Sequence, residues 1–134
     1  MILIFYFMAH ILGYDIWYYF IHICLHNIRL YRFHKYHHLI NYRDLTFADA
    51  FTGNMIEYPI QTLGIFIPNI VMEYHFRVIL CAYLFITIRT YMQHDYRCIW
   101  LVGNHHLIHH KHPKYNFGER WIDKICGTLH ETTV

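Results

Sequence analysis

Histidine is the residue type in this sequence whose number and spacing could carry chemistry. It accounts for 14 of 134 residues, and most of these fall into one HxxxH motif and two HxxHH motifs. The motifs contain His22 and His26, then His34, His37 and His38, and finally His106, His109 and His110. Residues three and four apart lie on the same face of a helix, so each motif can present imidazole nitrogens to a metal ion. A lone histidine between the last two motifs, His94, is a ninth candidate ligand.

This set of histidines is too large for a single metal ion. A zinc site uses about four ligands, so two ions fit the number of histidines better. Imidazole binds iron, zinc, copper and nickel, so the ligand type alone does not identify the metal. The sequence contains no HExxH motif and no CxxC pair, which disfavours the ordinary zinc sites. We therefore predict a histidine-ligated site for two metal ions.

Several other polar residues could hold the ligands by hydrogen bonding to them. These candidates are Asp15, Glu57, His105, Asn116 and Asp123, with Asp49 and Asp95 as further acids. A helix cap or a surface charge explains each acid at least as well. The remaining histidines are expected at interfaces, in turns or on the surface; they are His10, His75, His112 and His130.

The composition favours a membrane environment for these residues. Hydrophobic residues make up 56% of the chain and charged residues only 15%, compared with roughly 25% charged residues in soluble domains. Residues 1–25 are almost continuously apolar, with Asp15 as their only charge. This stretch is long enough to span a bilayer, and it lacks the basic start and small-residue cleavage site of a signal peptide. We predict a first transmembrane helix at about 1–26.

The rest of the chain completes a single all-α domain over residues 1–134. We expect interfacial amphipathic helices at about 27–55, a helical hairpin at about 57–92 and a histidine-rich C-terminal cap at 93–134. Four Lys or Arg residues lie in 29–43 and five in 97–124, and positive charge favours the cytosolic side. The predicted fold is thus an integral membrane helical bundle with a cytosol-facing histidine-rich cap.

Charge and cysteine content exclude other classes of protein. The net charge is only +2, with no run of Lys or Arg, so nucleic acid is not an expected partner. The four cysteines are widely separated, which is typical of reduced, packed cysteines rather than a disulfide framework.

These motifs resemble the fatty acid hydroxylase/sterol desaturase superfamily over most of the chain. Residues 15–26 (DIWYYFIHICLH) resemble its aromatic-rich helix ending in the first histidine box. Residues 30–38 (LYRFHKYHH) and 103–110 (GNHHLIHH) resemble the second and third boxes. Residues 116–118 (NFG) and 121–128 (WIDKICGT) resemble the closing signature.

Within the superfamily, three features resemble the sterol C4-methyl oxidase and sterol desaturase branch. They are the doubled His105 and His106, residues 53–59 (GNMIEYP) and residues 94–96 (HDY).

The resemblance implies a non-heme di-iron oxidoreductase. Two Fe²⁺ ions would activate O2 and attack an unreactive C–H bond of a sterol or fatty acyl lipid, giving hydroxylation or desaturation. It also implies a membrane of the endoplasmic-reticulum type and electrons from NAD(P)H through a cytochrome b5-type carrier. The expected partners are therefore the lipid substrate, the membrane and this electron-transfer protein.

The chain departs from the family in length. Family members usually carry further transmembrane helices before the first box, whereas this chain starts immediately before it and is N-terminally short. A homo- or hetero-oligomer could supply missing walls of the substrate chamber. The alternative function is a non-catalytic or split-enzyme membrane metal-binding subunit that lacks part of that chamber.

Overall fold

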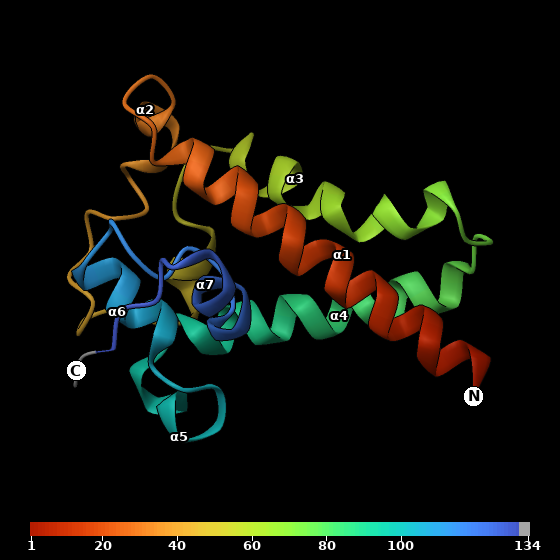
Figure 1. The fold of residues 1–134 in the computed structure, drawn as a ribbon. Coiled ribbons are helices and arrows are strands. Elements are labelled where there is room, and N and C mark those ends of the chain that lie inside the picture. Colours follow the sequence, from red (N-terminus) through yellow and green to blue (C-terminus); the bar gives the residue numbers. More distant parts are fainter. Residues whose placement is uncertain (132–134) are drawn as a thin grey trace.

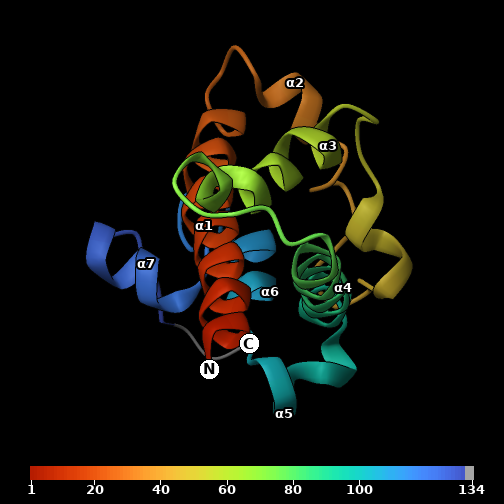
Figure 2. The same ribbon diagram turned by 90° about the vertical axis from the view of Figure 1, so that its right-hand side faces the viewer.

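The computed structural model describes residues 1–131, which fold into helices joined by loops, without β-strands. Two long helices, α1 (Ile2–Leu25) and α4 (Phe76–Gln93), run side by side. Between them in sequence lie α3 (Glu57–Thr62) and the 3₁₀ helix η2 (Leu63–Ile70), which pack along α1 (Figure 1). Figure 2 looks nearly along the axis of α4 and shows α1 crossing it at an angle. We call α1, α4 and the α3–η2 segment the rods of the bundle. The all-helical fold class expected from the sequence is confirmed.

The short helices lie at the end of the bundle where α1 and α4 have their C-terminal ends, and they form a cap there (Figure 1). In chain order they are α2 (Tyr31–His34), η1 (Phe47–Phe51), η3 (Tyr96–Cys98), α5 (Ile99–Val102), α6 (His105–Lys111) and α7 (Arg120–Cys126). The cap therefore combines the segment after α1 with the whole C-terminal part of the described chain.

Helix α1 separates its polar from its apolar side chains. His10, Asp15 and His22 are buried against the other elements, while Phe5, Phe20 and other large apolar residues are exposed. Among residues 1–131, α1 is the helix that is long and apolar enough to cross a membrane. Its outward apolar face and inward polar face are the arrangement expected of a helix in lipid.

Two apolar cores hold the molecule together. The core of the rods contains residues of α1, η2 and α4, namely Ile11, Tyr14, Ile65, Ile79, Ala82 and Ile86. A smaller core of Tyr19, Phe117 and Ile122 joins α1 to the C-terminal cap. The second core fixes the cap on the end of α1, where His22 lies.

The segment between α1 and α3 contains less helix than the sequence suggested. In place of interfacial helices over about 27–55, it has four residues of α2, five of η1 and a series of turns. The side chains of Asn27 and Asn41 accept hydrogen bonds from the backbone N–H groups two residues later, and Asp49 forms a capping box with Thr46. Such local hydrogen bonds compete with helix formation.

A glycine permits the close approach of η2 to α1. A Cβ atom placed on Gly64 would lie 2.5 Å from the Cβ of Trp17. The Trp17 indole N–H donates to the carbonyl of Ile60 at 2.8 Å, so the tryptophan is held at this crossing and has little freedom to move aside.

We therefore expect Gly64→Ala to destabilise the protein by about 1–3 kcal/mol, the usual cost of overpacking. Thermal unfolding of the purified protein in detergent measures this. Leu12→Ala, on the exposed side of α1, is the control and should have a much smaller effect. Equal melting temperatures for wild type and Gly64→Ala would contradict a tight α1–η2 crossing.

Candidate metal centre

The structure brings all nine predicted histidines together in two groups. The first group contains His22, His26, His34, His38 and His109, and the second contains His37, His94, His106 and His110. Within each group the candidate ligand nitrogens all lie within 4.8 Å of one another. The groups adjoin each other, since the rings of His38 and His110 have centroids 4.7 Å apart. This arrangement is consistent with a site for two metal ions.

The groups do not follow the sequence motifs. In each HxxHH motif the first and last histidines share a group: His34 and His38 in the first, His106 and His110 in the second. The middle histidine, His37 or His109, lies in the other group. Each HxxHH motif therefore contributes to both sites and joins them.

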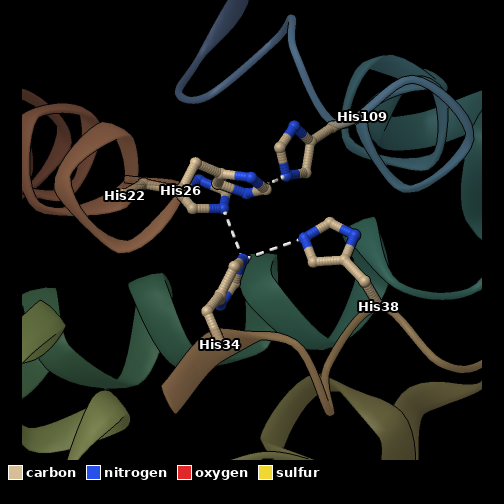
Figure 3. Close-up of side chains that lie close together, drawn as sticks. All are labelled: His22, His26, His34, His38 and His109. Atoms are coloured by element: carbon tan, nitrogen blue, oxygen red, sulfur yellow. Dashed lines mark hydrogen bonds between the residues drawn. The ribbon is translucent and has the colours of Figure 1, made fainter. Parts of the chain in front are cut away.

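In the first group, imidazoles from three parts of the chain point toward one another (Figure 3). The Nε2 atom of His34 lies 3.0 Å from Nε2 of His22 and 2.9 Å from Nε2 of His38. The Nε2 atoms of His26 and His109 are 3.1 Å apart. Helix α1 and its C-cap residue supply His22 and His26, α2 and the turn after it supply His34 and His38, and α6 supplies His109.

The second group shows the same pattern around the end of α4. His94 is the residue at which α4 ends. Its Nε2 atom lies 3.0 Å from Nε2 of His37 and 3.0 Å from Nε2 of His106. The group thus joins α4, the turn after α2 and the first turn of α6.

The opposite ring nitrogen of five of these histidines is bound to an oxygen. Each of these Nδ1 atoms lies within hydrogen-bond distance of a backbone carbonyl or a carboxylate. The Nδ1–O distances are 2.6 Å for His22 to Phe117 O, 2.6 Å for His34 to Glu57 Oε1, 3.1 Å for His37 to Thr52 O, 2.8 Å for His94 to Thr90 O and 2.6 Å for His109 to Tyr115 O. A carbonyl can only accept, so Nδ1 carries the proton. In the neutral ring Nε2 is then a bare acceptor.

Two bare acceptors about 3 Å apart cannot hydrogen bond to each other, whereas a metal ion between them binds both. Nitrogens about 2.1 Å from one ion lie roughly 2.9–3.0 Å apart at a 90° angle and about 3.4 Å apart in a tetrahedron. The observed spacings are closer to the first value. In addition, Nδ1 of His38 and both ring nitrogens of His110 are buried without a hydrogen-bond partner. The donor set therefore fits two metal ions.

Burial keeps the cap histidines in the neutral form that binds metal. It lowers the pKa of His37 to about 4 and that of His38 to about 3. Burial also lowers the pKa values of His109 and His110 to well below their usual range. Metal ligation requires deprotonated imidazole, so these side chains are ready to bind near neutral pH.

Two of the acids proposed from the sequence support the histidines. Glu57 accepts directly from Nδ1 of His34, as expected of a group that orients a ligand. Asp123 acts through the backbone: it is buried and accepts from the N–H groups of Phe117 and Gly118 at 2.9 Å each. It thereby holds the loop whose Phe117 carbonyl contacts His22.

The other candidates lie near the centre without contacting the nine histidines. His105 contacts Asp123 at 3.0 Å, and Asn116 binds backbone atoms of His105 and His130. Asp15 pairs with Arg89 of α4. Asp49 and Asp95 cap η1 and η3, as the simpler interpretation of each acid proposed.

His10, expected at an interface, in a turn or on the surface, lies at the interface of α1 and η2. It is fully buried, and its Nδ1 lies 2.7 Å from the carbonyl of Ile65. It lies in α1, whose outward face is apolar, so the polar ring is placed on the inward side of the helix.

Sequence reasoning missed the backbone carbonyls that fix the ligand rings. Thr52, Thr90, Tyr115 and Phe117 supply these oxygens. A carbonyl is present at every residue, so no side-chain pattern could have identified them.

The grouping predicts how metal content responds to single substitutions. We expect about two metal ions per wild-type chain and about one after either His109→Ala, which affects the first group, or His37→Ala, which affects the second. Metal analysis of the purified proteins measures this. His112→Ala, outside both groups, is the control and should bind as much as wild type. Unchanged metal content in both group variants would refute the assignment.

The lowered pKa values predict a metal-free protein that loses stability in acid. Unfolded histidines take up protons near pH 6.5, whereas folded His37 and His38 do so only near pH 4 and 3. Unfolding therefore takes up protons below about pH 6.5. The free energy of unfolding should be highest above that pH. As pH decreases toward 3–4, it should fall by up to ~1.4 kcal/mol per pH unit for each such histidine.

Denaturant titrations of the metal-free protein between pH 7.5 and pH 5 measure this dependence. His38→Asn should flatten it and His112→Asn should not. A free energy of unfolding independent of pH over this range would show that the buried histidines are not held neutral.

Comparison with known proteins agrees with this geometry. The fatty acid hydroxylase family model matches residues 7–128, which include all nine histidines of the two groups. The match does not specify the sterol desaturase branch. Searches of curated proteins and of solved structures gave no match. Membership implies a hydroxylase- or desaturase-type oxidoreductase and a membrane-associated protein. With the match covering most of its length, the chain belongs to the fatty acid hydroxylase family.

Proposed function

We propose that this protein is a membrane-bound non-heme di-iron oxidoreductase that uses O2 to hydroxylate or desaturate a C–H bond of a sterol or fatty acyl lipid. The observation that carries the proposal is the pair of adjoining all-histidine groups, whose Nε2 atoms face each other at about 3 Å. Family membership supports the same reaction class.

Iron is the metal we propose for both groups. An alkyl C–H bond has no acidic proton and no leaving group, so acid–base catalysis cannot open it and a redox centre is required. Bound iron would supply the electrons that O2 must receive. His22, His26, His34, His38 and His109 would hold one ion, and His37, His94, His106 and His110 the other.

The chain's own residues orient these ligands. The carbonyls of Phe117, Thr52 and Thr90 hold protons at Nδ1 of His22, His37 and His94, so that Nε2 stays free. Seven of the nine ligands are buried, which limits the access of water to the site, and His26 and His38 are partly exposed. These contacts set the ligand directions before metal binds, which lowers the cost of assembling the centre.

A largely apolar pocket beside the first group suits a lipid chain. It has a volume of about 590 Å³ and is lined by Ile23, His26, Asn27, Ile28, Tyr31, Pro113, Lys114 and Phe117. This size is within the usual range for small-molecule sites. His26 is both a wall of this pocket and a member of the first group. We propose that the lipid carbon reaches the metal here, with Lys114 near a polar or anionic head group.

We further propose that the cap faces the cytosol on an endoplasmic-reticulum-type membrane. Exposed cations lie on the segments that carry the histidines, namely Arg29, Arg32, Lys35, Arg43, Lys111 and Lys114, and positive charge favours the cytosolic side. A cytochrome b5-type carrier, reduced by NAD(P)H, is the proposed electron donor at this surface. Oligomer formation through the exposed apolar faces is compatible with this arrangement.

The proposal predicts a new oxidised lipid in cells that express the chain. Lipid profiling of such cells, with metal analysis of the same preparation, should show a hydroxylated or newly unsaturated product together with bound iron. His109→Ala should reduce the product to background. Ile23→Trp, which fills the pocket, should lower product by about tenfold or more while iron content stays unchanged.

Phe20→Trp, on the exposed side of the same helix, is the control for the pocket variant and should retain full activity. A purified protein that binds metal but consumes no O2 with reductant and lipid extract would contradict the proposal. That outcome would favour the metal-binding subunit as the alternative.

A further inference from the structure

A buried network of charged groups lies on the bundle side of the second histidine group. Arg89 of α4 pairs with Asp15 of α1, and its Nε atom lies 3.4 Å from Oε1 of Glu119 in the loop before α7. Gln93 of α4 donates from Nε2 to the same Glu119 oxygen at 2.7 Å. Charged side chains are costly to bury inside a membrane protein, so a buried cluster of them suggests a function.

This network borders a small cavity that reaches the metal ligands. The cavity has a volume of about 10 Å³ and is lined by Tyr14, Asp15, Tyr18, Arg89, Thr90, Gln93, His94, His106 and Glu119. That volume is close to the space of one water molecule, and the polar lining offers the hydrogen-bond partners that a buried water needs. Two of the lining residues, His94 and His106, belong to the second group.

Glu119 also lines a second, open pocket on the other side of the loop. This pocket has a volume of about 510 Å³ and is lined by Val102, Gly103, Asn104, His105, Ile108, Glu119, Arg120, Leu129, His130 and Glu131. Among the described residues, Glu119 is the one shared by this open pocket and the small cavity. Its side chain is 27% exposed, compared with 7% for Asp15. It therefore stands between solvent and the interior.

The reaction class proposed above consumes protons inside the protein. In hydroxylation, R–H, O2, two electrons and two protons give R–OH and water: the C–H and O–O bonds break, one oxygen atom enters the product and the other leaves as water. In desaturation, the same inputs convert –CH2–CH2– into –CH=CH– and two waters. The electron carrier supplies the electrons, but the protons must come from solvent.

We propose that Glu119 transfers these protons from the open pocket to the water-sized cavity beside His94 and His106. This inference rests on the proposed function. Glu119 takes up a proton on the open side and releases it into the cavity, whose volume suits one water molecule. Arg89 and Gln93 hold the carboxylate in place between the two spaces.

The surroundings of Glu119 include other titratable or charged groups. Asp15, Tyr14 and Tyr18 face the cavity from α1, Arg89 from α4 and His106 from α6, while His105, Arg120, His130 and Glu131 line the open pocket. Asp15 cannot replace Glu119, because it lines only the cavity and not the open pocket. Glu131 cannot replace it either, because it lines only the open pocket.

Glu119→Gln tests the transfer role, since the amide keeps the shape and the acceptor oxygen for Gln93 but cannot carry a proton. Glu131→Gln is the matched control, an acid of the same open pocket that does not reach the cavity. With iron-loaded, reduced protein and lipid extract, a single exposure to O2 should yield product about 100-fold more slowly in Glu119→Gln and at the wild-type rate in Glu131→Gln. Both variants should retain wild-type iron content.

A second measurement does not depend on turnover. Infrared difference spectra between the oxidised and reduced protein should contain a carboxyl signal that disappears in Glu119→Gln and persists in Glu131→Gln. Product formation in Glu119→Gln at the rate of the control, or an unchanged carboxyl signal, would overturn the inference.

Glu119→Asp decides the matter if Glu119→Gln loses iron, because it restores a carboxyl group. Recovery of the carboxyl signal and of product formation to within about tenfold of wild type supports proton transfer. A rate of product formation in Glu119→Asp as low as that in Glu119→Gln overturns the inference. Failure of the proposed function is distinct: wild type would then form no oxidised lipid, while the infrared comparison of Glu119→Gln with Glu131→Gln still tests Glu119.

Discussion

Opposed lone pairs of buried imidazoles are the constraint on which the rest of the structure depends. Carbonyl or carboxylate oxygens take up the Nδ1 protons of five ligands, so their Nε2 atoms can only accept. Packing bare acceptors at about 3 Å is unfavourable unless a cation lies between them. The fold is therefore built to hold positive charge, and the protein without metal is expected to be strained at the centre of its cap.

The long helices and the cap are linked through this centre. His22 belongs to α1, and His26 and His94 cap the C-terminal ends of α1 and α4, so the rods supply ligands that the cap histidines complete. The small core of Tyr19, Phe117 and Ile122 adds an apolar attachment beside the Phe117 carbonyl that holds His22. Metal binding should consequently stabilise the association of cap and rods as a whole rather than the cap alone.

Spacing in the sequence identified eight of the nine histidines that the structure brings together, and His94 was added as a lone candidate between the last two motifs. A continuous apolar run identified α1. Both signals are local in the sequence. The division of the histidines between the two groups could not be predicted from the sequence. That division depends on where short helices such as α2 end: only four residues are helical there, and His37 and His38 then lie in turns that point them to different groups. The carbonyls that orient the rings, and the burial of His10, depend on tertiary contacts that leave no pattern in the side chains.

Charge balance offers a physical reason for the position of the acids. Neutral imidazoles do not offset the charge of bound metal ions, so compensation has to come from carboxylates outside the ligand set. Glu57 contacts His34 in the first group. Asp15 and Glu119 share the single cation Arg89 beside the second group, which leaves an excess of negative charge near His94 and His106 when both are ionised. Each histidine group thus has a nearby carboxylate, and the one beside the second group, Glu119, also lines an open pocket.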